Sequence, residues 1–231
     1  MIAILVLGFL VGMRHALEAD HVAAVSSIAS DQTRLREAVQ HGLTWGLGHT
    51  ITLFLFAGAA ILLGRAIPAG VQSGLEMAVG FMLVGLGTNV LWRLWRDRVH
   101  FHPHRHDNGL THLHAHGHAG EDAPHAHASH EHEHTFRWRT LVVGLMHGMA
   151  GSAALLVLAA TQLAGAAQGI MYVLVFGVGS MVGMGLLSSV IAVPFAMSAR
   201  FLTWSNRWLQ AVVGTTTIAI GLMTILRSSL P

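Results

Sequence analysis

Long apolar segments separated by short polar ones make up most of this chain. The apolar segments cover residues 2–29, 40–63, 74–95, 139–163, 168–198 and 208–227. An α-helix of roughly 20 apolar residues is long enough to cross the hydrocarbon core of a bilayer. The pattern therefore predicts an all-α integral membrane protein with six transmembrane helices.

The polar break after the third apolar segment divides these helices into two groups of three. We expect a first three-helix unit at residues 1–98, a histidine-rich loop at 99–138 and a second three-helix unit at 139–231. An odd number of spans per unit gives the two units opposite orientations in the membrane.

The two units resemble each other at an almost constant offset of 131–134 residues. Three pairs of short segments align: 11–15 with 143–147, 46–49 with 177–180, and 78–80 with 212–214. The offset holds across three helices, which predicts a 3+3 inverted repeat.

Composition supports the membrane assignment. Hydrophobic residues are 53% of the chain and charged residues 10%, against about 25% charged in soluble domains, and the mean hydropathy is +0.56. Cysteine is absent, which excludes disulfides and thiol chemistry. Every basic residue is arginine, so the lysine of a phosphate-binding loop is missing. A net charge of +2 does not favour a nucleic-acid partner.

Five ionisable residues lie inside the first apolar segment: Arg14, His15, Glu18, Asp20 and His21. A charged group at membrane depth costs about 2.5–3.5 kcal/mol. Such groups must pair with one another, line a wet cavity or bind a cation. Imidazole and carboxylate together suit a divalent nickel, cobalt or zinc ion.

The spacing of these residues does not suit a regular helix. At about 100° per residue, His15, Glu18 and His21 fall on an arc of about 120°, whereas Asp20 lies about 140° from His15. A straight helix cannot direct His15, Asp20 and His21 at one ion. Either the helix is broken here, or Glu18 replaces Asp20, or other helices complete the site. The alternative without metal is a salt-bridged helix in which Arg14 pairs with Glu18.

The second apolar segment adds His49, which lies well inside it behind Gly46 and Gly48. These glycines allow another helix to approach closely. His49 is a candidate ligand, and its alternative role is a hydrogen-bonded packing histidine. We expect His41 and Trp45 to be structural, with Trp45 in an interfacial aromatic belt.

The second unit keeps fewer of these groups. His147 aligns with His15, while Ser152 aligns with Asp20 and Ser180 with His49. We expect the first unit to supply the main ligands. His147 is either an outer ligand or proton carrier, or a structural histidine.

The loop between the units carries thirteen of the 18 histidines. They are His100, His102, His104, His106, His112, His114, His116, His118, His125, His127, His130, His132 and His134. The loop has no apolar periodicity, so we expect it to be disordered without metal and to bind several metal ions weakly. A solvated linker without function is the alternative.

The motifs resemble those of a known family. The sequence from His15 to His21 resembles the His-x4-Asp-His signature of the nickel/cobalt transporter superfamily, and residues 22–25 resemble its continuation. Gly48, His49 and Thr50 resemble its second motif. Residues 144–154 resemble the short urease-accessory-type nickel permeases, to which the chain is more similar than to the longer members.

This resemblance implies a carrier rather than an enzyme, with Ni2+ or Co2+ as the transported substrate and no organic cofactor. We expect nickel uptake, with a cytoplasmic nickel chaperone as a candidate partner beside the lipid bilayer. Three alternatives remain open: nickel or cobalt efflux, an intramembrane haem or metal redox protein, and a metal-binding subunit of an ATP-driven importer.

Arginine counts predict the orientation. The polar segments after the first, third and fifth spans hold most of the arginines, and positive loops face the cytoplasm. We expect a multi-pass protein of the bacterial cytoplasmic (inner) membrane with both termini outside and the histidine-rich loop inside.

Overall fold

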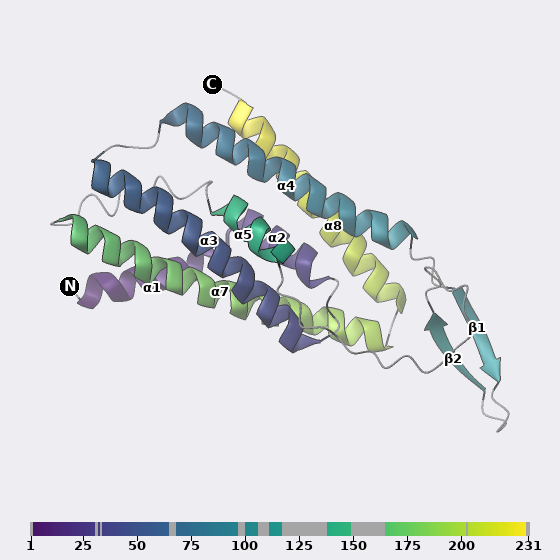
Figure 1. Ribbon diagram of the computed structural model, residues 1–231. Helices are drawn as coiled ribbons and strands as arrows, with labels where there is room; N and C mark the ends of the chain where they lie inside the picture. The colour runs from purple at the N-terminus through teal and green to yellow at the C-terminus, as the bar shows by residue number, and fades with distance from the viewer. Residues whose placement is uncertain are drawn as a thin grey trace.

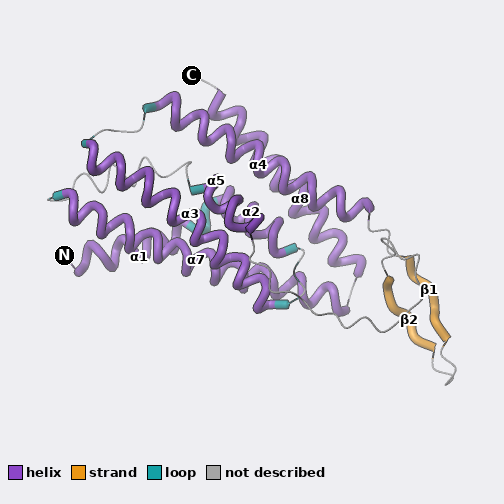
Figure 2. Tube along the Cα trace, viewed as in Figure 1, coloured by secondary structure: helices purple, strands orange, loops and turns teal. Residues whose placement is uncertain are grey.

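The structure is a computed structural model that describes residues 2–30, 32, 34–64, 68–96, 100–105, 111–116, 138–148, 165–201 and 203–229. Its helices are α1 (Ile2–His15), α2 (Ala19–Ala29), α3 (Leu35–Leu63), α4 (Ala69–Arg96), α5 (Trp138–His147), α7 (Ala166–Phe201) and α8 (Thr203–Ser229). They lie side by side in one elongated bundle, and a two-stranded hairpin extends from one end (Figures 1 and 2).

Helices α3, α4, α7 and α8 are each long and apolar enough to cross a membrane. Helices α1 and α2 meet at an angle of 59° at a short break, and they count as a fifth span if the bent pair crosses the membrane as one unit. Four of the predicted spans therefore correspond to described helices, and the first corresponds to the bent pair. The remaining predicted span, the fourth, covers residues 139–163; α5 covers its beginning, and residues 149–164 lie outside the described part.

The histidine-rich loop differs from its prediction. Strand β1 (His100–Arg105) pairs with β2 (Thr111–His116) in an antiparallel hairpin, with His100 opposite His116 and His104 opposite His112. These twelve positions are thus drawn as strands where the sequence suggested no regular structure, and disorder of the loop without metal stays a prediction. Histidine alternates with other residues here, and this period of two is the one that a β-strand requires. A segment with this pattern can therefore adopt a strand. The other loop residues lie outside the description.

Each half of the bundle packs against the other half. Helix α1 packs on α7, α5 packs on α3, α3 packs on α7, and α4 packs on α8. Figure 1 shows α4 and α8 running together along one side of the bundle, with α3 and α7 along the other. The broken pair α1–α2 reaches both layers, because α2 contacts both α7 and α8.

Glycines determine how closely the two backbones of each helix pair approach. A Cβ atom at Gly12 of α1 would meet the backbone carbonyl of Phe176 in α7, and one at Gly144 of α5 would meet that of Trp45 in α3. Contacts this close between helix backbones require the absence of a side chain. The α1–α7 and α3–α5 interfaces therefore depend on glycine at these positions.

The same geometry recurs elsewhere in these interfaces. A Cβ at Gly48 would meet Leu141, and one at Gly179 would meet Phe9. In the α4–α8 pair, Gly80 faces Gly221 and Gly87 faces Gly214, so the two backbones come together at both crossing points. The described residues thus place glycine opposite glycine, or glycine opposite backbone, at each of these crossings.

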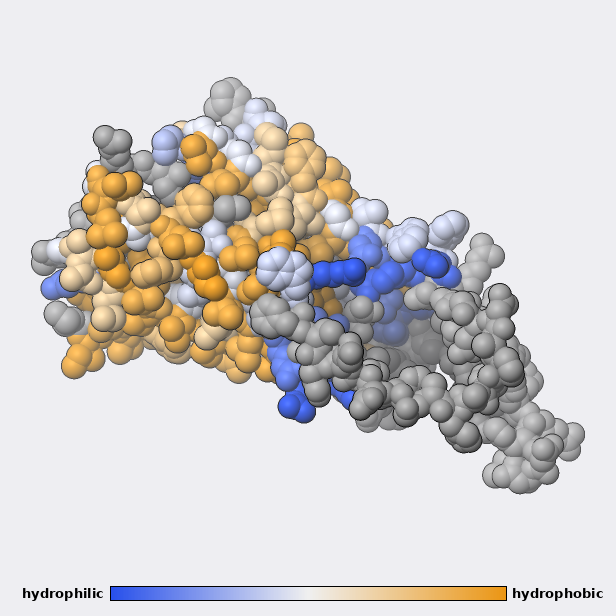
Figure 3. Space-filling model, in the orientation of Figure 1, coloured by the Kyte–Doolittle hydropathy of each residue, from blue (hydrophilic) through white to orange (hydrophobic). Residues whose placement is uncertain are grey.

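The outer surface of the bundle is apolar along its sides (Figure 3). Hydrophilic residues gather at the end from which the hairpin extends (Figure 3). Five exposed tryptophans accompany them: Trp92, Trp95, Trp138, Trp204 and Trp208. Aromatic rings beside arginines are typical of a membrane–water interface, and this end is the arginine-rich one.

Candidate metal site

The site begins at the break in the first span. Two short-range backbone bonds close α1, from Leu17 N–H to the Arg14 carbonyl and from Glu18 N–H to the His15 carbonyl. Glu18 is then extended, with φ −64° and ψ 146°, and α2 starts at Ala19. The expected departure from a regular helix between His15 and His21 is confirmed. Because of the break, His15 ends α1 while His21 lies in α2, and the two helices run in different directions.

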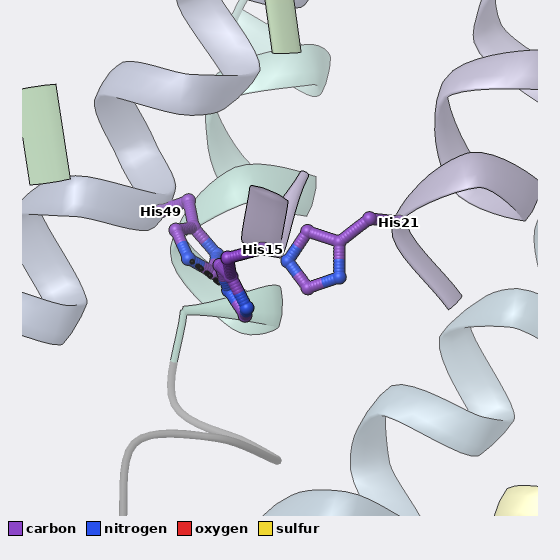
Figure 4. Close-up of side chains that lie close together, drawn as sticks. All are labelled: His15, His21 and His49. Atoms are coloured by element: carbon purple, nitrogen blue, oxygen red, sulfur yellow. Dashed lines mark hydrogen bonds between the residues drawn. The ribbon is translucent and has the colours of Figure 1, made fainter. Parts of the chain in front are cut away.

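Three histidines converge at this break. The Nε2 atoms of His15 and His49 are 3.2 Å apart, and the rings of His15 and His21 are 4.3 Å apart between centroids. One donor nitrogen from each of His15, His21 and His49 lies within 4.8 Å of the other two. Figure 4 shows a nitrogen of the His21 ring directed at the other two histidines. With metal–nitrogen bonds of about 2.0–2.1 Å, two ligands of one ion lie roughly 3.0–3.4 Å apart, so the spacing of His15 and His49 suits one ion.

Asp20 lies on the opposite side of His21. Its Oδ1 is 2.9 Å from His21 Nδ1, and its Oδ2 is 3.1 Å from Nε2 of His147. That same His147 nitrogen is 3.3 Å from His21 Nδ1. Asp20, His21 and His147 therefore form a second group of ligand atoms that all lie within 4.8 Å of one another.

Asp20 also belongs to the start of α2. Its Oδ1 accepts a hydrogen bond from the backbone N–H of His21 at 2.9 Å, one of the first amides of a helix, which have no partner within it. The positive end of the α2 dipole favours the carboxylate there. The break thus gives the Asp20 carboxylate a free helix N-terminus that stabilises its negative charge. A continuous helix would not offer this partner.

Glu18 orients His15. Its Oε1 is 2.9 Å from His15 Nδ1, and its side chain is 46% exposed. A carboxylate can only accept a hydrogen bond, so Nδ1 of His15 carries the proton and Nε2 presents its lone pair to the site. Carboxylates behind metal-binding histidines commonly act in this way. The salt-bridged alternative is disfavoured, because a helix broken between His15 and Ala19 lacks the register that pairs Arg14 with Glu18.

The histidines are removed from solvent. His15, His21, His49 and His147 are at most 4% exposed, and His21 Nε2, His49 Nδ1 and His147 Nδ1 have no hydrogen-bond partner among the described residues. A buried polar atom without a partner costs about 1–3 kcal/mol. Binding a cation through Nε2 of His21 would satisfy one of these atoms.

Sequence reasoning placed Trp45 wrongly. It does not lie in an interfacial belt; it is fully buried, with its ring 5.4 Å from that of His21 and 5.2 Å from that of His147. It therefore forms the wall of the site between α3 and α5. Its position one helical turn before His49 was the available signal, since residues four apart share a helix face.

The remaining predicted groups fall into three cases. His41 was expected to be structural, and its Nδ1 lies 2.7 Å from the Thr140 hydroxyl, away from both groups of ligand atoms. Ser180 is fully buried. Ser152 lies outside the described residues, and of the histidine-rich loop only the backbone of the hairpin is described.

This architecture defines a class: a membrane protein whose broken first span, with α3 and α5, encloses a buried cluster of histidines and one carboxylate suited to a divalent transition metal. Residues 1–228 match the family model NicO, described as high-affinity nickel-transport protein, and the chain belongs to this family. It is a transporter family rather than an enzyme family. Membership confirms the resemblance drawn from the motifs.

Two relatives are similar over different lengths. The urease accessory protein UreH of Bacillus sp. (strain TB-90) is 32% identical over 91% of this chain and 85% of its own length. A protein of Methanocaldococcus jannaschii named as a putative nickel/cobalt efflux system is 30% identical over 42% of this chain and 44% of its own length. No solved structure matches the chain.

Proposed function

We propose that this protein is a secondary carrier that takes up Ni2+, with Co2+ as a second substrate, through a principal site built by His15, Asp20, His21 and His49. The observation that carries the proposal is the convergence of His15, His21 and His49 on one buried point at the break in the first span. Glu18 and His147 contribute beside them, through His15 and Asp20 respectively.

The donor set supports a borderline metal. Imidazole nitrogens with a carboxylate suit nickel, cobalt and zinc, while magnesium and calcium prefer oxygen. The carboxylates suit a bare cation better than haem, so absence of a Soret band from the purified protein would agree with this proposal.

Uptake is the proposed direction because the urease accessory relative matches nearly the whole chain, whereas the efflux relative matches less than half. We expect cells that express the chain to accumulate more 63Ni2+ than cells with an empty vector, and unlabelled Co2+ to compete more strongly than Mg2+. Lower accumulation than in the vector control would instead identify an exporter, and no difference would contradict nickel transport.

We also propose that the two three-helix units, residues 1–98 and 139–231, form an inverted repeat with six spans, the fourth of which extends from α5. The packing supports this. With the sequence offset of 131–134, Gly12 against Phe176 corresponds to Gly144 against Trp45. The contact of Gly48 with Leu141 corresponds in the same way to that of Gly179 with Phe9. Helix α3 of the first unit is equivalent to α7 of the second, and α4 is equivalent to α8.

The surface supports an orientation in the cytoplasmic (inner) membrane. Both termini lie at the end of the bundle opposite the hairpin (Figure 1), and the arginines and exposed tryptophans gather at the hairpin end. By the positive-inside rule, the hairpin end is cytoplasmic and the termini are outside. A cytoplasmic histidine-rich loop could pass arriving metal to a nickel chaperone.

Deleting residues 100–134 should leave a folded carrier that still transports nickel. The hairpin lies beyond the end of the helices (Figure 1), and the loop has no pattern that forms a core. The measurement is the initial rate of 63Ni2+ accumulation normalised to protein in the membrane, against the full chain. Complete loss of transport at a normal protein level would show that the loop belongs to the transport machinery.

A further inference from the structure

His21 belongs to both groups of ligand atoms, and it enters each through a different ring nitrogen. Nδ1 contacts Asp20 and His147. The nitrogen directed at His15 and His49 in Figure 4 is therefore Nε2, which is buried and has no hydrogen-bond partner among the described residues.

A neutral imidazole has one lone pair on its ring nitrogens, because the other nitrogen carries a proton. His21 can therefore bind a metal through Nε2 or through Nδ1, but not through both while it remains neutral. Two ions on the same ring would require loss of its remaining N–H proton, which leaves an imidazolate, and would place two divalent charges on either side of that ring.

We infer that the site comprises two metal positions that share His21 and are occupied in turn by a single Ni2+ or Co2+ ion. Position A is formed by His15, His21 and His49, and position B by Asp20, His21 and His147. The inference rests on the proposed carrier function and deepens it, because it replaces one site by two successive ones.

In the structure as it stands, His21 and His15 present Nε2 lone pairs to position A, and His49, whose Nε2 lies 3.2 Å from that of His15, joins them when its ring proton is on Nδ1. The Asp20 carboxylate accepts the hydrogen bond from His21, so Nδ1 carries the ring proton and Nε2 presents its lone pair to position A. Glu18 fixes His15 in the corresponding form. The two carboxylates are then supports behind the ligands rather than ligands themselves.

Position B uses the same groups in other roles. Asp20 becomes a ligand, and His21 and His147 bind through Nδ1 and Nε2 respectively. The ring proton of His21 then moves to Nε2, facing the His15 and His49 rings, and the ring proton of His147, which Nε2 donates to Asp20 in the structure, moves to Nδ1. Each ring carries one proton in either case, so the exchange changes no net protonation. The two nitrogens are 3.3 Å apart, which matches the ligand spacing around one ion, and each lies beside one oxygen of Asp20, at 2.9 Å for Oδ1 and 3.1 Å for Oδ2.

One histidine of each position has an equivalent aromatic neighbour in the two halves. The His15 ring lies 5.4 Å from the Phe176 ring, and the His147 ring lies 5.2 Å from the Trp45 ring. In the alignment of the halves, His15 corresponds to His147 and Phe176 to Trp45. Units of opposite orientation place equivalent points toward opposite membrane faces, so an ion moving between A and B would advance across the membrane.

The test is Co2+ binding to the purified full-length chain, by equilibrium dialysis and by visible absorption of the bound ion. The histidine-rich loop is the same in every variant, so ions at the membrane site are counted by difference from His21→Ala. We expect the parent to bind one more ion than His21→Ala. His49→Ala and His147→Ala should each keep that ion, and the double variant should lose it.

The spectra should show where the ion remains. His147→Ala should leave Co2+ among three histidines at position A, and His49→Ala should leave it at position B with a carboxylate ligand, so their difference spectra should be unlike. Both single variants should fail to accumulate 63Ni2+ in cells. Gel filtration checks the fold, and His49→Gln and His147→Gln replace any alanine variant that aggregates.

Loss of the ion in either single variant, or two additional ions in the parent, would overturn the two-position inference while the carrier function stands. If the parent accumulates no nickel and binds no more Co2+ than His21→Ala, the proposed function itself is wrong, and this inference with it.

Discussion

Replacing His21 with alanine should reduce 63Ni2+ accumulation to the level of cells without the protein. His21 is the only described residue common to both groups of ligand atoms, so its removal leaves two donors in each. The same substitution removes the His21 ring from Oδ1 of Asp20, while the His147 ring and the backbone N–H of residue 21 stay as partners of the carboxylate. The measurement is the initial uptake rate normalised to the amount of protein in the membrane.

The matched control is His41→Ala. His41 is a histidine in the same bundle that bonds to Thr140 and belongs to neither ligand group. We expect this variant to take up nickel close to the parent rate. Parent-like uptake by His21→Ala, at an equal membrane level, would show that the metal path lies elsewhere in the protein.

Replacing Gly144 with alanine should destabilise the whole fold. The added Cβ would meet the backbone of Trp45, and backbone cannot move aside as the end of a flexible side chain can. Overpacking of this kind costs about 1–3 kcal/mol. It would also force α5 away from α3 at the wall of the metal site. We expect a lower apparent melting temperature in detergent and less protein in the membrane.

Gly85→Ala is the control for this prediction. Gly85 lies within α4, and a Cβ there would meet nothing within 4 Å. Since alanine favours a helix over glycine by about 1 kcal/mol, this variant should melt at or above the temperature of the parent. Equal melting temperatures for Gly144→Ala and the parent would mean that the α3–α5 contact is looser than described.

Several parts of this structure could be predicted from the pattern of residues alone. Apolar segments of sufficient length identify spans because every backbone polar group in lipid must be satisfied within its own helix. The spacing of His15, Asp20 and His21 excluded a straight helix that directs all three at one ion, and a broken helix was one of the three arrangements it left open. His15, His21 and His49 stood out because ionisable groups are costly at membrane depth.

Only the tertiary structure decided how these residues are grouped. The sequence places Asp20 beside His21 but does not say that their side chains meet through Nδ1, or that His147, 127 positions away along the chain from Asp20, completes a second ligand group. Trp45 looked like an interfacial residue because amphipathic rings are common there, and the packing of α5 on α3 buried it instead. Such contacts depend on how closely helices from different halves approach, and glycines facing backbone across the interface set that distance. The sequence marked Gly46 and Gly48 as sites of close approach, but it did not say which helix packs there.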